Sequence, residues 1–418
     1  MATAVIDRND ISYADRAREA GAKLLRDMEA ALPVVRAHAS EVEALGKVHP
    51  ESLEALTKAG FFRAVVPLQY GGMECDPLSY MTACIRISQE CPATGWVVGF
   101  YAVHAFQVAL LDDRAQSEFW ANGPDTRASS SYPPTGTVVS VEGGFRLSGE
   151  WQYSSGVEHA GWALLGGKIV DAPDGEDEYR TFLVPASDWV LKEGSWDVIG
   201  LKGTGSRTLV IDNAFVPEYR THSSVDVYQG TERGFAVNDR PLYRLPFWSV
   251  FNLSVTATAL GIARGGINAF IEAAKTRVSF AGKGAQVATS PFVQLRIFDA
   301  ISNLDRAQDR MTANWRNMYE TILQGHKLDR LSSIRGRVDG SDSIVVAFRS
   351  LTEIMEAAGG GVLFESNPLQ RYFRDSLGVR VHPTAQREMF GTTYVQLLLG
   401  LEIPPFDKSN MFSMVLHT

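Results

Sequence analysis

Cysteine is scarce in this chain of 418 residues. The three cysteines, Cys75, Cys84 and Cys91, form no Cys-x-x-Cys pair, so neither a disulfide framework nor a zinc knuckle is indicated. We therefore expect a reducing compartment, the cytoplasm. The histidines show no H-x-x-x-H or H-E-x-x-H spacing, and no carboxylate cluster accompanies them, so we expect no metal site.

An excess of positive charge is also missing. The chain carries 40 Lys and Arg against 48 Asp and Glu, a net charge of -8, which gives no basic surface for nucleic acid or an anionic membrane. Residues 1–19 lack the apolar segment and cleavage site of a signal peptide, and the longest apolar runs are too interrupted to span a bilayer. We expect a protein that binds neither nucleic acid nor a membrane.

The sequence does contain enough apolar residues, 45%, for a globular protein of roughly two or three domains. In the first part these residues recur at helical spacing, which predicts an N-terminal helical domain over residues 1–126. The expected helices cover residues 13–45, with a break near Pro33, and then 50–56, 78–88 and 93–111.

Short runs of β-branched and aromatic residues, separated by glycine, begin at about Arg127. They predict an antiparallel, barrel-like β domain over residues 127–235. The expected strands cover residues 136–141, 144–149, 163–166, 181–185 and 208–212. Long helical patterns return between residues 253 and 359 and predict a C-terminal four-helix bundle within residues 236–418.

Three motifs in the first 160 residues suggest a function. They are Thr94-Gly95-Trp96 leading to His104, Ala128-Ser129-Ser130-Ser131, and Trp151-Gln152-Tyr153-Ser154-Ser155-Gly156. Together with Gly203–Ser206 and Leu369–Asp375, they resemble the acyl-CoA dehydrogenase superfamily. Within this superfamily the sequence resembles the oxygenase components of two-component flavin-dependent aromatic monooxygenases. Examples are 4-hydroxyphenylacetate 3-hydroxylase and the secosteroid phenol hydroxylase. The resemblance covers nearly the whole chain and implies an α+β, acyl-CoA dehydrogenase-like fold.

This resemblance implies a reaction as well. Reduced FMN or FAD would arrive by diffusion from a separate flavin reductase and react with O2. The resulting C4a-hydroperoxide would hydroxylate a phenolic substrate ortho to its hydroxyl. The segment Gly200–Gly205 is not a dinucleotide fingerprint, because it precedes a strand instead of opening a helix, so the chain is not expected to reduce its own flavin. The resemblance also implies a homotetramer.

Three residues are candidates for catalysis. By resemblance His104 faces the substrate hydroxyl, where a neutral imidazole would accept a hydrogen bond from the phenol and make the ring more reactive toward an electrophilic oxygen. By resemblance Ser155 lies near N5 of the flavin. His382 stands where acyl-CoA dehydrogenases carry a catalytic glutamate, and Gln386 stands where some relatives place an aspartate, so a partner for His382 is left open.

The same resemblance assigns binding residues. A flavin needs small hydroxyl side chains, an aromatic wall and, for its phosphate, cations. The expected flavin-binding residues are Trp96, Ser129, Ser130, Ser131, Trp151, Ser154, Ser155, Arg277, Gln370 and Arg371, with Arg277 reaching the flavin across a subunit boundary. The expected substrate-binding residues are His104, Ser130, Tyr243, Phe247, Trp248 and Phe251.

Other functions stay open at this point. N- or S-oxygenation would use the same scaffold without a phenol partner at His104. An acyl-CoA dehydrogenase or oxidase would need a carboxylate base, where this chain has His382 and Pro383. A binding protein without catalysis is a further alternative. FMN versus FAD and the identity of the substrate are not determined by the sequence.

Overall fold

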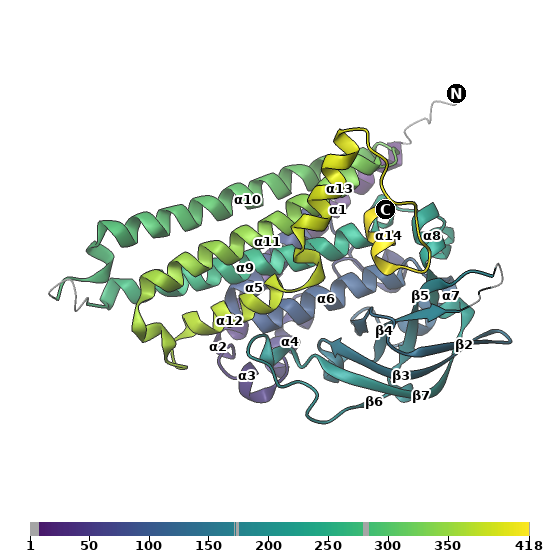
Figure 1. Ribbon diagram of the computed structural model, residues 1–418, viewed down its shortest axis with the longest axis horizontal. Helices are drawn as coiled ribbons and strands as arrows, with labels where there is room; N and C mark the ends of the chain where they lie inside the picture. Colours follow the sequence, from purple (N-terminus) through teal and green to yellow (C-terminus); the bar gives the residue numbers. More distant parts are fainter. Residues whose placement is uncertain (1–7, 171, 173–174, 279–283, 418) are drawn as a thin grey trace.

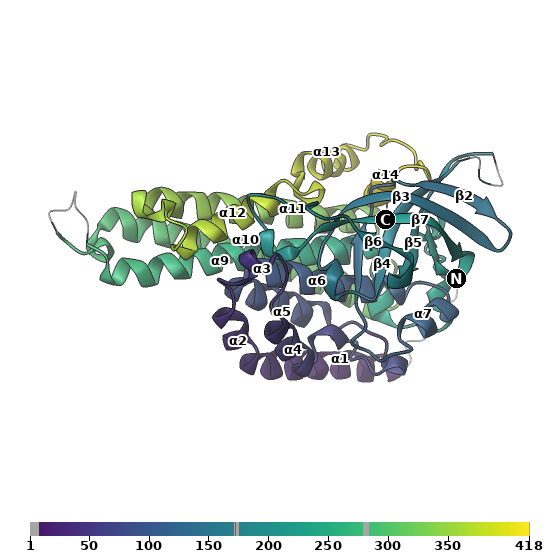
Figure 2. The ribbon, with the colours of Figure 1, turned by 90° about the horizontal axis from the view of Figure 1, so that it is seen from below.

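The computed structural model describes residues 8–170, 172, 175–278 and 284–417. Long helices form one end of the molecule and a β-sheet forms the other, with the N-terminal helices packed along one side (Figures 1 and 2). The helices are α1 (Arg8–Asp27), α2 (Leu32–Ala37), α3 (Val42–Leu45), α4 (Pro50–Lys58), α5 (Pro77–Glu90), α6 (Pro92–Val108), α7 (Asp113–Phe119), α8 (Ser224–Gln229), α9 (Phe247–Thr276), α10 (Pro291–Leu323), α11 (Arg330–Ala358), α12 (Pro368–Arg380), α13 (Arg387–Leu398) and α14 (Met411–His417). The strands are β1 (Ala128–Ser131), β2 (Thr137–Val141), β3 (Gly144–Ser154), β4 (Trp162–Ile169), β5 (Glu178–Pro185), β6 (Val190–Leu191), β7 (Arg207–Pro217) and β8 (Thr221–Ser223).

Proline sets the start of several N-terminal helices. It occupies the first turn of α2, α4, α5 and α6, where its missing N–H costs no hydrogen bond. The stretch 13–45, predicted as a helix with a break near Pro33, forms three helices, α1, α2 and α3. The break near Pro33 is confirmed, because Pro33 lies in the first turn of α2, where a new helix begins.

The strands form one sheet in the order β6-β7-β3-β2-β4-β5-β8, and β1 pairs with β4. The antiparallel expectation needs a correction, because β1 and β2 each pair with β4 in parallel. The pairing of β3 with β7 is irregular between Trp151 and Ser154, and Tyr153 has a φ of 64°. This irregularity changes the direction of the chain just before Ser155.

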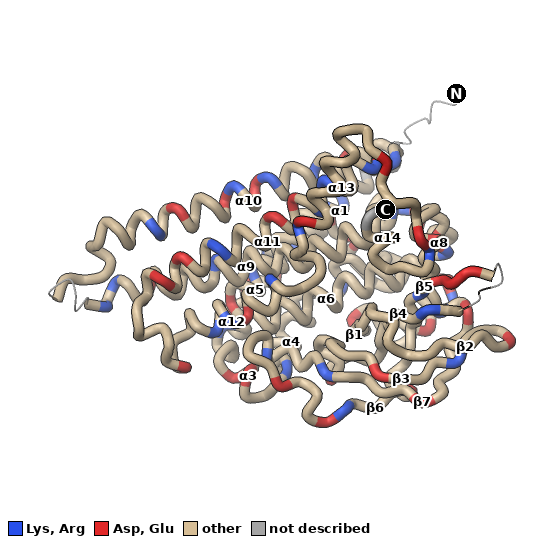
Figure 3. Tube along the Cα trace, viewed as in Figure 1, with Lys and Arg blue, Asp and Glu red and all other residues tan. Residues whose placement is uncertain are grey.

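Helix α9 is the centre of the helical part. It packs against α5 and α6 on one side and against α11 and α12 on the other, while α10 packs on α11. By length and composition α9 could cross a membrane, which the sequence did not lead us to expect. However, 94% of the most apolar 18-residue stretch of α9 is buried inside the protein. Its apolar character therefore suits the core of the bundle. Lys and Arg alternate with Asp and Glu along the outer helices (Figure 3).

A joint holds the loop before β7 against α12. Asp375 accepts a hydrogen bond from the Leu201 amide at 2.5 Å, and burial raises the pKa of Asp375 to about 7. Arg374 donates to the Ile199 carbonyl at 2.6 Å and to Glu43 of α3 at 2.9 Å. These contacts join the N-terminal helices, the β domain and the bundle.

We expect Arg374→Met to lower the free energy of unfolding by about 1–3 kcal/mol, because it removes hydrogen bonds of a partly buried cation that join three parts of the chain. Urea denaturation measures this change. Arg387→Met is the matched control, since its ion pair with Asp342 is more exposed and is worth at most about 1 kcal/mol. Equal effects of the two substitutions would contradict the joint.

Candidate active site

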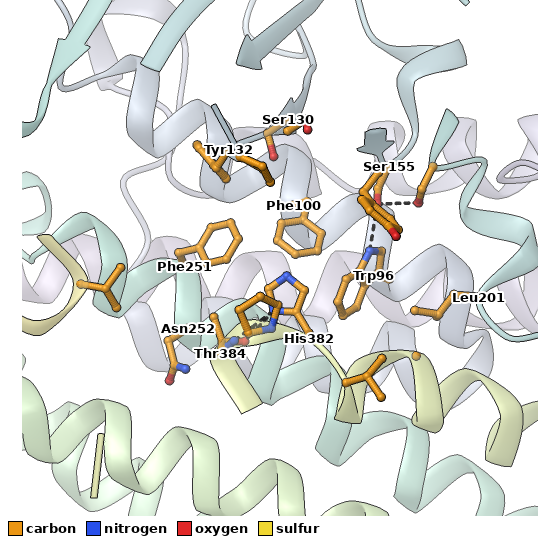
Figure 4. A pocket seen from close by; sticks show the side chains of 18 of the residues that line it. Trp96, Phe100, Ser130, Tyr132, Ser155, Leu201, Phe251, Asn252, His382 and Thr384 are labelled. Atoms are coloured by element: carbon orange, nitrogen blue, oxygen red, sulfur yellow. Dashed lines mark hydrogen bonds between the residues drawn. The ribbon is translucent and has the colours of Figure 1, made fainter. Parts of the chain in front are cut away.

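A cavity of about 680 Å³ opens where α6, the start of α9 and the end of α12 meet the β-sheet. Most of its wall is aromatic or aliphatic (Figure 4). The residues that line it are Trp96, Phe100, His104, Ser130, Ser131, Tyr132, Pro133, Tyr153, Ser155, Trp196, Val198, Ile199, Gly200, Leu201, Ser206, Trp248, Phe251, Asn252, Arg337, Leu377, Gly378, Val381, His382, Pro383, Thr384, Met389, Phe390, Met411, Phe412 and Val415. They come from all three parts of the chain.

Helix α6 supplies one wall. Trp96, Phe100 and His104 follow one another at four-residue spacing, which places them on one face of the helix. The ring centroids of Phe100 and His104 are 5.7 Å apart, and the centroid of the His382 ring lies 6.4 Å from Phe100 and 5.5 Å from Trp96. Both histidine rings therefore lie beside Phe100 in the same cavity.

The hydrogen bond of His104 fixes its tautomer. Nδ1 lies 2.7 Å from the Ala128 carbonyl oxygen, which can only accept, so Nδ1 carries the proton. Burial lowers the pKa of His104 to about 4, partly offset by this carbonyl, and the ring is neutral at pH 7. Nε2 therefore presents a lone pair, and it is buried with no hydrogen-bond partner among the described residues.

His382 has the opposite orientation. Its Nδ1 accepts from the Thr384 amide at 3.3 Å and lies 2.8 Å from the Thr384 hydroxyl. Burial lowers the pKa of His382 to about 4, so the neutral ring carries its proton on Nε2. The partner of this histidine is thus Thr384, while the side chain of Gln386 is exposed.

A chain of hydroxyl groups orients Ser155. Thr204 donates to the Leu201 carbonyl at 2.8 Å, so it accepts from Ser206 at 2.6 Å. Ser206 in turn accepts from Ser155 at 2.7 Å, and Ser155 accepts from Nε1 of Trp96 at 3.1 Å. Because its proton is already used, Ser155 offers the cavity an acceptor and not a donor.

Two wall residues have unusual backbone conformations. Tyr153 and Leu201 have φ values of 64° and 55°, in the left-handed region that residues other than glycine rarely adopt. The Leu201 conformation is supported by the hydrogen bond that its backbone N–H donates to the Asp375 carboxylate. Tyr153 packs against Trp196 with the ring centroids 6.1 Å apart. Such strain is typical of functional sites.

Eight of the residues predicted from the sequence line this one cavity. They are Trp96, His104, Ser130, Ser131, Ser155, Trp248, Phe251 and His382. In Figure 4, Ser155 and Trp96 lie to one side of His382, and Phe251 lies to the other. The catalytic candidates therefore converge.

Several other predicted binding residues do not line the cavity. Trp151 was expected at the flavin, but it is fully buried in the β core and donates to the Gly166 carbonyl at 2.8 Å. Ser154 and Ser129 bond to each other, 3.1 Å apart, inside the sheet. These three side chains support the wall from behind, because the alternation along a strand turns them inward.

The substrate assignment of Tyr243 and Phe247 is corrected in the same way. Tyr243 is fully buried, bonds to the Val65 carbonyl at 3.1 Å and packs on Phe106. Phe247 packs behind Tyr132, with the ring centroids 6.2 Å apart. Both belong to the apolar core behind the wall.

Within one chain the three distant flavin candidates are also separate from the cavity. Arg277 follows the end of α9, roughly 40 Å along the helix from Trp248. It lines a second cavity, of about 230 Å³, and bonds to the Ala358 carbonyl. Gln370 bonds to the Glu365 carbonyl and to Arg374, and neither Gln370 nor Arg371 lines the first cavity.

Several wall residues were not predicted from the sequence. Phe100 could have been found, since it lies midway between Trp96 and His104 at helical spacing. Asn252 and Arg337 gave no signal, because only the packing of α9 against α11 brings them to the cavity. The C-terminal segment that contains α14 was not anticipated either.

One histidine and carboxylate group lies elsewhere. His38, Glu41 and His49 could together hold a metal ion, and they are the one such group found among the described residues. The expectation that no carboxylate cluster accompanies the histidines is therefore wrong. Glu41 and Glu51 bond to His38 at 3.1 and 3.2 Å, so this group already forms a network of ion pairs.

Known proteins resemble this chain over most of its length. Residues 24–118 match the acyl-CoA dehydrogenase N-terminal domain, and residues 253–387 match the C-terminal domain. A "flavin-dependent monooxygenase, oxygenase subunit HsaA" of Rhodococcus jostii is 34% identical over 88% of this chain and 97% of the relative. An "FADH(2)-dependent resorcinol hydroxylase, oxygenase component" of a Rhizobium species is 31% identical over 94% and 98%. The crystal structure of a 3-HSA hydroxylase from a Rhodococcus species, 33% identical, covers 93% of this chain and 99% of its own, with a TM-score of 0.86.

Proposed function

Since the chain belongs to the acyl-CoA dehydrogenase family and, within it, to the oxygenase components of flavin-dependent aromatic monooxygenases, we propose that its cavity holds reduced flavin at Ser155 and a phenol at His104. The observation that carries this proposal is the convergence of a lone pair on His104, a proton on His382 and an acceptor on Ser155 in one apolar cavity.

The Ser155 end suits reduced flavin. N5 of a reduced flavin bears a hydrogen and donates, whereas N5 of an oxidised flavin only accepts. Because the hydroxyl chain through Ser206 leaves Ser155 as an acceptor, it matches the reduced form. When bound, reduced flavin supplies, together with O2, the oxygen atom that is transferred to the substrate. Trp96, Tyr153 and Trp196 provide the aromatic wall for a flat ring.

The His104 end suits a phenol. Nε2 of His104 accepts a hydrogen bond from the ring hydroxyl, which increases the electron density at the ortho carbons. With a pKa of about 4 the imidazole is a weak base, so His104 polarises the hydroxyl through a hydrogen bond instead of removing its proton. His382 contributes an Nε2 donor beside Phe100, and this donor can bond to an oxygen atom of a ligand.

The wall chemistry argues against the other reaction classes. The side chains that line the cavity in the described part of the chain include no Asp or Glu, so the base needed for acyl-CoA dehydrogenation is missing from it. A sulfur substrate has no donor for His104, whereas a phenol does. The geometry therefore favours oxygenation of a hydroxylated ring.

The protein depends on other components. As an oxygenase component it needs a partner flavin reductase, and we propose that reduced flavin, FMN or FAD, reaches it by diffusion in the cytoplasm. The three buried free thiols support a reducing compartment. We also propose a homotetramer, because Phe292, Phe298 and Leu363 are 81%, 64% and 80% exposed in a single chain.

We expect His104→Ala to lower the yield of hydroxylated phenol at least about 10-fold while flavin oxidation continues and more hydrogen peroxide is released. The reason is that the ring would lose the acceptor that activates it. Product and hydrogen peroxide per reduced flavin are measured with a generic reductase. His326→Ala, at an exposed histidine, is the control and should behave as wild type. An unchanged ratio in His104→Ala would refute the role of His104.

Ser206→Ala tests the polarity of the hydroxyl chain. Without Ser206, Ser155 can donate into the cavity, so the preference for reduced over oxidised flavin should fall by about 10-fold, the effect of one hydrogen bond. Fluorescence titration of oxidised flavin and anaerobic titration of reduced flavin give the two affinities. Ser187→Ala on the surface is the control. A preference as strong as that of wild type would show that Ser155 is not oriented in this way.

A further inference from the structure

A buried carboxylate lies behind the Ser155 end of the cavity. Asp375 on α12 is 2% exposed, and one of its oxygens accepts a hydrogen bond from the backbone N–H of Leu201 at 2.5 Å. Leu201 lines the cavity, and Figure 4 shows it on the same side of His382 as Trp96 and Ser155. Asp375 is not itself a lining residue, so it contacts the wall from outside.

Helix α12 holds Leu201 in an unfavourable backbone conformation. The φ of Leu201 is 55°, and a residue with a side chain keeps such a conformation only where its surroundings impose it. Asp375 is the one acceptor that the described part of the chain offers to the Leu201 N–H, and a buried N–H without an acceptor costs free energy. Gly378, one helical turn after Asp375, lies against the Leu201 side chain, because a Cβ there would come within 2.8 Å of it.

The carbonyl of Leu201 transmits this orientation toward the cavity. It accepts from the Thr204 amide at 3.1 Å and from the Thr204 hydroxyl at 2.8 Å. The Thr204 hydroxyl accepts from Ser206 at 2.6 Å, and Ser206 accepts from Ser155 at 2.7 Å. A continuous series of hydrogen bonds therefore connects Asp375 with Ser155.

This series of hydroxyl groups has two possible directions. Each hydroxyl has one proton, so the direction of the first bond determines the direction of the others. If Leu201 relaxed to a negative φ, its carbonyl would turn away from Thr204. The Thr204 hydroxyl would then be free to donate to Ser206, Ser206 to Ser155, and Ser155 into the cavity. Only the direction that begins at the Leu201 carbonyl leaves Ser155 as an acceptor.

We propose that Asp375 is a positioning residue for the flavin: by holding the backbone of Leu201, it fixes Ser155 as a hydrogen-bond acceptor and so favours reduced over oxidised flavin. The inference rests on the proposed function and deepens it, because it names a group outside the cavity that sets this preference. Asp375 contacts no ligand and acts through Leu201, Thr204 and Ser206.

The test measures the affinities for reduced and oxidised FMN in full-length Asp375→Ala, alone and combined with Ser206→Ala. The titrations are made at pH 8, where most of Asp375 is ionised because its pKa is about 7. We expect Asp375→Ala to lower the ratio of the two affinities about 10-fold, since it releases the hydroxyl of Ser155. The double variant should lose no more than Ser206→Ala alone, because both changes act on one series of bonds.

Two further variants separate positioning from folding. Asp375→Asn keeps the shape of the side chain and a weaker, neutral acceptor, so it should lose less of the preference, and it replaces Asp375→Ala if that variant does not fold. Arg374→Met breaks the bond to the Ile199 carbonyl in the same loop but leaves the series intact, so it should keep the wild-type preference.

Three results would overturn the proposal. They are an unchanged preference in Asp375→Ala, a further loss when Asp375→Ala is added to Ser206→Ala, and an equal loss in Arg374→Met. The last result would mean that any loosening of the loop has the same effect, so that the bond to Leu201 has no special role.

The flavin-free protein gives a readout that does not depend on the proposed function. Nε1 of Trp96 donates to Ser155 at 3.1 Å, and Nε1 of Trp196 donates to the Leu201 carbonyl at 3.3 Å. In protein labelled with ¹⁵N-tryptophan, both N–H signals, identified by their loss in Trp96→Phe and Trp196→Phe, should shift in Asp375→Asn and stay in place in Arg374→Met.

These signals distinguish the two possible failures. If Ser206→Ala does not change the preference for reduced flavin, the proposed position of the flavin at Ser155 fails, and the indole signals still decide whether Asp375 orients Ser155. Indole signals that stay in place in Asp375→Asn would overturn the role of Asp375 and leave the proposed function intact.

Discussion

The hydrogen bond between Nδ1 of His104 and the Ala128 carbonyl determines the chemistry of the cavity. The carbonyl oxygen can only accept, so the one N–H proton of the neutral imidazole is on Nδ1. Nε2 therefore presents a lone pair to the cavity. Burial keeps the ring neutral. Because Ala128 begins β1 and His104 lies on α6, this bond also holds the edge of the sheet against the helix.

The cavity depends on complementary polarity. His104 presents an acceptor and His382 a donor, although the same burial lowers the pKa of both rings. The difference comes from the partners of the two Nδ1 atoms, a carbonyl for His104 and the Thr384 amide for His382. The polarity of Ser155 is likewise fixed by a neighbour, because its hydroxyl donates to Ser206. In an apolar cavity such fixed hydrogen-bonding directions decide which ligand atoms can be held.

Much of this site could be predicted from the sequence, in particular where residues lie close together on one element. Trp96 and His104, and Ser130, Ser131 and Ser155 of the serine motifs, do lie in the wall of one cavity. Trp151 was misplaced because a strand turns alternate side chains to opposite faces, and an irregular strand hides which face is which. Arg337 could not be found, since it enters the site through the contact of two helices far apart in the sequence.

The most direct test is nitrogen NMR of the imidazole rings in protein labelled with ¹⁵N-histidine, with the signals of His104 identified by their loss in His104→Ala. The account predicts a neutral ring at pH 7 with the proton on Nδ1 and none on Nε2, and this form should persist to pH 5 because the pKa of His104 is about 4. A doubly protonated ring at pH 7, or a proton on Nε2, would contradict it.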